Sequence, residues 1–197
     1  MHLLLDNDAF CKLALAGLLH QTVHQLELNI SDCRKLPSLP HMLRRGKLRA
    51  HLGDQNADSL INFANSIDNI TSPNVTLVDS LTSKSEIDAG EALIFASAAE
   101  NKSFLITGDK RALSALRSIN PYPQALDGRI VLLESALLSL CKTTDVENIR
   151  KSVQTIKNLD KVVSICFSPG VSNPKVALES YFNNAVNEFS PLNLWKP

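Results

Sequence analysis

The feature that most limits how this chain can fold is the alternation of short apolar runs with helical segments. Residues 2–5, 103–107 and 129–133 are mainly apolar, and a segment with helical spacing of apolar side chains follows each of them. Residues 2–5 in particular lack the alternation of a half-buried strand, as expected for the buried centre of a parallel sheet. Strands that alternate with helices imply a parallel sheet covered on both faces. The sequence therefore predicts an α/β fold with three α/β/α layers around a mainly parallel sheet.

Two weaker strands are predicted between the first and second of these runs. Residues 26–30 alternate weakly between apolar and polar side chains, and residues 75–78 form a mainly apolar run that Pro73-Asn74 precedes. The helix over residues 86–101 is predicted to begin at a capping box in Ser85–Asp88. The other helices of this part are predicted from residue 7 or 8 onward and over residues 36–46, 57–67, 110–119 and 134–141.

The pattern changes after about residue 143. From Asp145 to Phe167 the apolar residues have helical spacing, although residues 161–167 alone could form a strand. Pro169-Gly170 interrupts this segment, and Pro174–Phe189 is predicted as one more helix. We therefore expect an α/β domain over residues 1–143 and a helical C-terminal extension over residues 144–197 that packs on it.

Composition places limits on the class of protein. The chain has 197 residues, which is enough for one domain and a small appendage, and its 20 basic residues balance its 20 acidic ones. This balance argues against a surface that binds nucleic acid everywhere, but it allows a local basic patch. The four cysteines form no Cys-x-x-Cys pair and are predicted to be buried thiols of a reducing compartment. Without a signal peptide or a membrane-spanning apolar stretch, we expect a cytoplasmic protein with no membrane partner.

Acidic side chains follow two of the predicted strands and begin the helix between them. Asp6 ends the first strand, Asp109 follows the strand at 103–107, and Glu91 lies one turn into the intervening helix. Ligands of open α/β sheets bind at the C-terminal edge of the strands, and clustered carboxylates suit a hard divalent cation. Each acid also has a structural interpretation, as a helix cap for Asp6 and Asp109 or as a first-turn acid for Glu91. Asp88 shares a helical face with Glu91 or completes the capping box.

Three segments resemble the motifs of the PIN-domain nucleases. They are Leu3–Asp8, Asp88–Ala96 and Leu105–Leu113, and the resemblance covers roughly residues 2–135. It implies a metal-dependent endoribonuclease that cuts RNA with Mg²⁺ or Mn²⁺ held by acidic side chains. Asp6, Glu91 and Asp109 would then be the metal ligands and catalytic residues. Asp8, Asp88 and Thr107 would support these ligands or add to them.

The chain departs from the PIN pattern in one place. Many members carry a further Glu on a helix between the first and the later motifs, but residues 32–43 contain no Glu. Asp32 is the nearest acid and stands too early in the chain. An alternative is therefore a catalytically degenerate domain that binds RNA or protein, with the C-terminal extension as its docking surface. The apolar side chains of that extension include Phe182, Phe189, Leu192, Leu194 and Trp195.

Basic residues near the motifs are candidates for contact with the RNA backbone. These are Lys110, Arg111, Arg44 and Arg45, although a run such as residues 44–49 also suits a solvated helix end. His20 and His24 have metal-ligand spacing but no third ligand, which indicates a surface pair. The resemblance further implies RNA as a partner and makes a homodimer or a cognate protein inhibitor a hypothesis.

A haloacid-dehalogenase-like phosphatase is the rival enzyme class. Asp6-Asn7-Asp8 fits its Asp-x-Asp motif, and Gly108-Asp109 would be its late metal motif. Against it, residues 9–12 replace the small residues expected after that motif, and Glu91 would have no role. A phosphatase should hydrolyse p-nitrophenyl phosphate through an aspartyl-phosphate on Asp6, and a nuclease should not.

Overall fold

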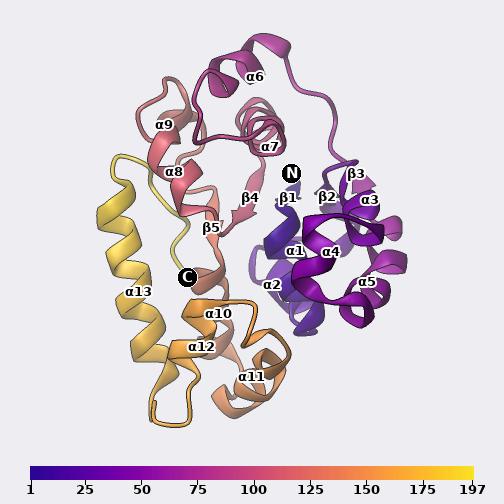
Figure 1. Cartoon of the computed structure of the whole chain (residues 1–197). Coiled ribbons are helices and arrows are strands. Elements are labelled where there is room, and N and C mark those ends of the chain that lie inside the picture. The colour runs from indigo at the N-terminus through magenta and orange to yellow at the C-terminus, as the bar shows by residue number, and fades with distance from the viewer.

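The computed structural model describes all 197 residues and contains a sheet of five parallel strands (Figure 1). The strands are β1 (Leu3–Leu5), β2 (Cys33–Lys35), β3 (Asp68–Asn69), β4 (Phe104–Thr107) and β5 (Ile130–Leu132), in the spatial order β3-β2-β1-β4-β5. Strand β1 lies at the centre, where Leu3 pairs with Cys33 on one side and with Phe104 on the other. The predicted α/β fold with a parallel central sheet is confirmed.

Helices flank this sheet (Figure 1). They are α1 (Asn7–Leu15), α2 (Leu19–Gln25), α3 (Leu39–Arg44), α4 (Lys47–Leu52), α5 (Asp54–Ser66), α6 (Val75–Thr82), α7 (Ala89–Asn101), α8 (Lys110–Leu116), α9 (Tyr122–Ala125), α10 (Leu133–Thr143), α11 (Val146–Ser152), α12 (Lys161–Cys166) and α13 (Pro174–Phe189), with 3₁₀ turns at Ile30–Asp32 and Val153–Ile156. None of them has the length and apolar character that crossing a membrane requires.

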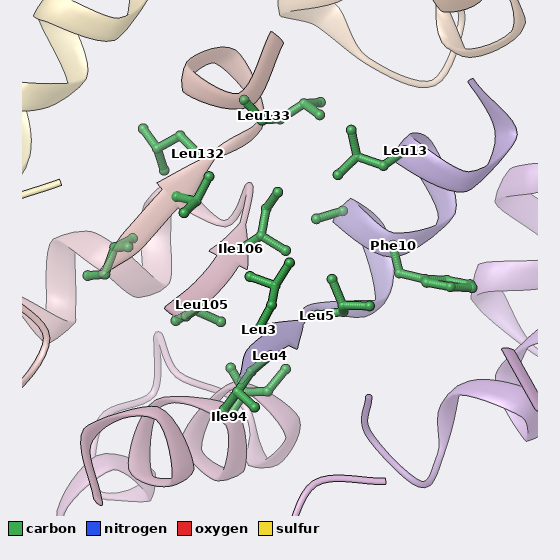
Figure 2. Close-up of a cluster of buried hydrophobic side chains, with 14 of the residues drawn as sticks. Leu3, Leu4, Leu5, Phe10, Leu13, Ile94, Leu105, Ile106, Leu132 and Leu133 are labelled. Carbon is green, nitrogen blue, oxygen red and sulfur yellow. The ribbon is translucent and has the colours of Figure 1, made fainter. Parts of the chain in front are cut away.

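The core lies on both faces of the central strands. Side chains of successive strand residues point to opposite faces, and in Figure 2 Ile94 of α7 lies against Leu4 while Leu13 of α1 lies on the side of Leu5 and Ile106. All three residues of β1 and of β5 are buried. Burial on both faces explains why these strands are continuously apolar in sequence.

Both weak strand predictions are wrong. Residues 26 and 27 form a turn, in which Glu27 has a left-handed backbone with φ of 58°, and Ile30 begins a 3₁₀ helix. The neighbour of β1 is Cys33–Lys35 instead. Residues 75–78 belong to helix α6, whose first turn is capped by the Asn74 side chain accepting from the Thr76 N–H. The edge strand β3 consists of the exposed residues Asp68 and Asn69, which carry no strand signal of their own.

Helix α7 begins at Ala89, three residues later than the predicted start at residue 86. Its N-cap is Asp88, and the capping box is completed by Glu91 at the third helical position. The side chain of Asp88 accepts from the Glu91 N–H at 2.8 Å, and Glu91 accepts from the Asp88 N–H at 2.7 Å. Both acids therefore stabilise the helix end in addition to any role in binding.

The C-terminal residues share the core of the preceding α/β part. Helix α13 packs on α10, α12 and α8, and Phe182 and Phe189 are buried in the common hydrophobic core. Beyond α13, the Trp195 N–H donates to the Ile130 carbonyl of β5 at 2.8 Å. Residues 161–166 are helical rather than extended. The boundary at residue 143 stays a prediction, although α10 ends there.

The four cysteines are buried and unpaired. Burial raises the pKa of each thiol, to about 12 for Cys11 and Cys33 and to about 11 for Cys141 and Cys166. Thiols of this kind are unreactive components of the core, as the sequence predicts.

Candidate functional site

An acidic cavity opens at the C-terminal edge of β1 and β4. Its volume is about 610 Å³. It is lined by five carboxylates, Asp6, Asp8, Asp88, Glu91 and Asp109, and by Asn7, Leu36, Ser38, Met42, Leu48, Ala89, Gly90 and Gly108. Every acidic residue that the sequence predicts for the site therefore lines this one cavity, which we call the acidic cavity.

The pairing of two adjacent strands brings Asp6 and Asp109 together. Leu5 is in register with Ile106, and the Asp6 N–H extends the ladder by donating to the Ile106 carbonyl at 3.1 Å. Thr107 at the end of β4 is buried and connects the two acids. Its Oγ1 donates to Asp6 Oδ2 at 3.4 Å and accepts from the Asp109 N–H at 3.2 Å. The predicted supporting role of Thr107 thus has a geometric basis.

Helix α7 delivers the remaining acids through its first turn. Gly90 stands between Asp88 and Glu91, and a Cβ atom at this position would lie 3.2 Å from Leu36 Cδ1 and 3.3 Å from Asp88 Oδ1. A larger residue would require the Leu36 side chain, which also lines the cavity, or the turn itself to shift. Glycine therefore allows the close approach that encloses the site.

The helix-capping interpretations hold for some acids and not for others. Asp109 Oδ1 caps α8 by accepting from the Ala112 N–H at 2.9 Å. Asp6 stands at the N-cap position of α1, but its side chain makes no cap hydrogen bond. Its carboxylate, which accepts from the Thr107 hydroxyl, is therefore not committed to capping the helix.

Burial and neighbouring charges make Asp6 a weak acid. Desolvation is the main cause, and repulsion from Asp8 and Asp109 adds to it. Together they raise the pKa of Asp6 to about 7, against smaller opposing effects of the Asn7 backbone and the Thr107 hydroxyl. Near neutral pH this carboxyl group is consequently divided between its protonated and ionised forms.

Glu91 is perturbed in the same direction. Desolvation first, then a hydrogen bond with the Asp109 side chain and repulsion from Asp109 and Asp88, raise its pKa to about 8, while the Asp88 N–H opposes the shift. Glu91 is therefore held less readily in its ionised form by its burial and by the neighbouring carboxylates of the cavity.

The chemistry of these donors fits a hard divalent cation, because every charged group of the cavity lining is a carboxylate. A cation bound in the cavity would offset the repulsion between these carboxylates. Their spacing is not that of a finished metal site, however. No group of three or more His, Cys, Asp or Glu side chains is arranged so that it could hold a metal ion.

The predicted basic residues do not line the acidic cavity. Lys110 forms an ion pair of 2.8 Å with Glu134, whose side chain is only 4% exposed, so this lysine is bound within the protein. Arg111 is exposed, and its Nη2 lies 3.7 Å from Asp109 Oδ2. Arg44 and Arg45 are exposed at the end of α3, two and three residues after Met42 of the cavity lining.

The predicted histidine pair lies elsewhere. His20 and His24 are exposed on α2, and the His20 ring stacks on Phe63 with 5.8 Å between ring centroids. Neither residue reaches the acidic cavity, and the interpretation as a surface pair agrees with this arrangement.

Sequence reasoning missed three residues next to the predicted acids. Asn7 lines the cavity, and its buried Oδ1 has no hydrogen-bond partner. Lys12 forms an ion pair with Asp8 that its i,i+4 spacing could have indicated. Asp160 binds the same lysine from 148 residues away, and no sequence signal connects the two.

The fold and the cavity together define an α/β protein with an acidic site at the C-terminal edge of a parallel sheet. No protein-family model, no curated protein and no solved structure matches this chain.

Proposed function

We propose that this protein is a metal-dependent endoribonuclease that hydrolyses RNA with Mg²⁺ or Mn²⁺ at the acidic cavity. The observation that carries the proposal is the convergence of Asp6, Glu91 and Asp109 from three separate elements on one cavity. The raised pKa values of Asp6 and Glu91 support it, because they mark carboxylates that lack a compensating cation. The resemblance of the three motifs to PIN-domain nucleases points to the same chemistry.

Each of these acids would contribute oxygen atoms that helix capping leaves free. Asp109 uses Oδ1 as a cap and Glu91 uses Oε2, so Asp109 Oδ2, which lies 3.7 Å from Arg111 Nη2, and Glu91 Oε1 are the oxygens that capping does not engage. Asp6 makes no cap bond, and Thr107 fixes its orientation. When bound, Mg²⁺ or Mn²⁺ would supply positive charge that activates a water molecule and stabilises the leaving oxygen. The three side chains would have to draw together around the ion, since they do not form a closed site as they stand.

Arg111, Arg44 and Arg45 would attract the RNA backbone to this site. All three are exposed, and they flank the cavity from α8 and α3. Contacts of this kind act on phosphates without reading bases, so they give affinity that falls with rising salt concentration. Lys110 is less suited to this role because it is engaged with Glu134.

The test combines Mn²⁺ titration by calorimetry with cleavage of single-stranded RNA. Asp109→Asn is the informative variant, because asparagine caps a helix as well as aspartate and the fold should survive. The matched control is Glu179→Gln, which removes an exposed carboxylate of α13 remote from the acidic cavity. We expect the wild type and Glu179→Gln to bind Mn²⁺ and cut RNA, and Asp109→Asn to lose both properties.

A wild-type protein that binds no Mn²⁺ would refute the nuclease proposal. Hydrolysis of p-nitrophenyl phosphate that depends on Asp6, without RNA cleavage, would instead identify the phosphatase alternative.

We propose a non-catalytic RNA- or protein-binding module as the second candidate. It is favoured by one observation, the lack of any group of three side chains arranged to hold a metal ion. Retention of labelled RNA in the presence of EDTA, without metal-dependent cutting, would support this candidate. A homodimer and a protein inhibitor stay predictions that the structure does not address.

A further inference from the structure

A buried lysine lies directly behind the acidic cavity. Lys12 of α1 has a side chain that is 11% exposed, and its Nζ lies 2.6 Å from Asp8 Oδ2 and 2.8 Å from Asp160 Oδ2. Asp8 lines the cavity, but Lys12 does not. The ammonium group therefore compensates the charge of a cavity carboxylate from within the protein and occupies none of the cavity itself.

The second partner of this lysine comes from the C-terminal extension. Asp160 is the N-cap of α12, where its Oδ1 accepts from the Val163 N–H at 2.9 Å while its Oδ2 binds Lys12. The Asp160 side chain is 13% exposed, so the pair with Lys12 is well shielded from solvent. Its two oxygens thus tie the orientation of Lys12 to the fold of residues 144–197.

We propose that Lys12 is a built-in cation of the acidic cavity, and that Asp160 of the C-terminal extension shares its ammonium group with Asp8 and thereby offsets part of its charge. This inference rests on the proposed function. It assigns a role in metal binding to a segment that contributes no residue to the cavity lining.

The charges of Lys12 and Asp160 should change the metal affinity of the cavity in opposite directions. Lys12 occupies Asp8 Oδ2, so it withholds that oxygen from a cation in the cavity and also repels the cation. Asp160 partly neutralises the lysine, so its charge favours a cation in the cavity. Loss of Lys12 should therefore strengthen metal binding, and loss of the Asp160 charge should weaken it.

The experiment measures Mn²⁺ affinity by calorimetry for three variants. Lys12→Met removes the charge with little change in chain length, and Asp160→Asn removes the charge while keeping a residue that caps α12 equally well. The double variant removes both charges and leaves no buried carboxylate at position 160 without its lysine. Glu147→Gln is the matched control, because it breaks an exposed ion pair with Arg150 in the same extension, on α11.

We expect Lys12→Met to bind Mn²⁺ roughly three- to tenfold more tightly than the wild type, and Asp160→Asn to bind it more weakly by a similar factor. The double variant should fall between them, and Glu147→Gln should equal the wild type. A purely structural role of the ion pairs would lower the affinity in both single variants. That result, or unchanged affinity in both, would overturn the proposal. If Lys12→Met does not fold, the other two variants still test the proposal. The double variant should then bind Mn²⁺ more tightly than Asp160→Asn, and equal or weaker binding would overturn the proposal.

A second measurement separates this inference from the proposed function. The carboxyl ¹³C signal of Asp8, assigned with Asp8→Asn, reports the environment of Asp8 without any metal. It should shift in Lys12→Met and in Asp160→Asn but not in Glu147→Gln. If the wild type binds no Mn²⁺, the proposed function fails. A shift of the Asp8 signal in Asp160→Asn then still supports the sharing of Lys12 between Asp8 and Asp160, and an unchanged signal refutes it.

Discussion

Two clusters of acidic side chains near helix α1 differ in how their charges are compensated. Asp8, which lines the acidic cavity, and Asp160, which does not, share the Lys12 ammonium group at 2.6 and 2.8 Å. In the acidic cavity, Asp6 and Glu91 have no cation of their own, and their pKa values rise to about 7 and about 8. The first cluster is complete within the protein, whereas the second is left for a proton or an external cation to complete. This difference distinguishes a structural ion pair from a candidate binding site.

The largest effect should come from breaking the compensated cluster. Lys12→Met leaves Asp160 buried without its partner, and such a loss costs about 3 kcal/mol of unfolding free energy. Asp8 should contribute little to this cost, because its side chain is 42% exposed and water can solvate it. Urea denaturation at pH 7 measures the change. A loss below about 1 kcal/mol would show that the pair is no stronger than a surface ion pair.

The uncompensated cluster should respond with the opposite sign. Because the folded-state pKa values of Asp6 and Glu91 are raised, the folded protein binds more protons than the unfolded chain between about pH 4 and pH 8. Without metal, the unfolding free energy should therefore fall as the pH rises through this range. Asp6→Asn should stabilise the metal-free protein at pH 8 by about 2 kcal/mol and have little effect at pH 4.

Thermal unfolding in EDTA at both pH values checks this prediction. Added Mn²⁺ should raise the unfolding temperature of the wild type at pH 8, but it should leave that of Asp6→Asn unchanged. Equal stability of the metal-free wild type at pH 4 and pH 8 would contradict the idea that the cavity is short of positive charge.

Substitutions of Asp88 distinguish its role as the cap of α7 from any role of its charge in binding. Asp88→Ala removes the acceptor of the Glu91 N–H and should cost about 1 kcal/mol. Asp88→Asn keeps that acceptor and should cost only a few tenths of a kcal/mol. Chemical denaturation of the two variants measures the difference. If Asn is as damaging as Ala, the Asp88 charge has a role beyond capping.

The smallest effect should come from an exposed pair outside both clusters. The Glu147 side chain is 63% exposed where it binds Arg150, so Glu147→Gln should change the unfolding free energy by less than about 0.5 kcal/mol. The same denaturation assay measures it. A larger loss would mean that the neighbouring Arg150, which also binds the Phe167 and Val171 carbonyls, depends on Glu147 for its position.

Whether the sequence predicted a strand correctly depended on what determines that strand, its burial or its pairing with other strands. Strands β1, β4 and β5 were predictable because they are buried on both faces and must therefore be apolar. Strands β2 and β3 were not, because they join the sheet through backbone hydrogen bonds to Leu3–Leu5 and to each other. The run at 75–78, in which three of four residues are β-branched, was misleading, because intrinsic strand preference yields to a capped helix where no partner strand is available.

The same distinction applies to the site. The sequence by itself determined that acids follow two buried strands and begin the intervening helix, since strand ends and caps are local features. Only the tertiary structure decided that β1 lies beside β4, that these acids face one cavity, and that Asp160 reaches Lys12. Pairing and burial depend on contacts between residues far apart in the chain, and burial raises the pKa of Asp6 while leaving no trace in local spacing.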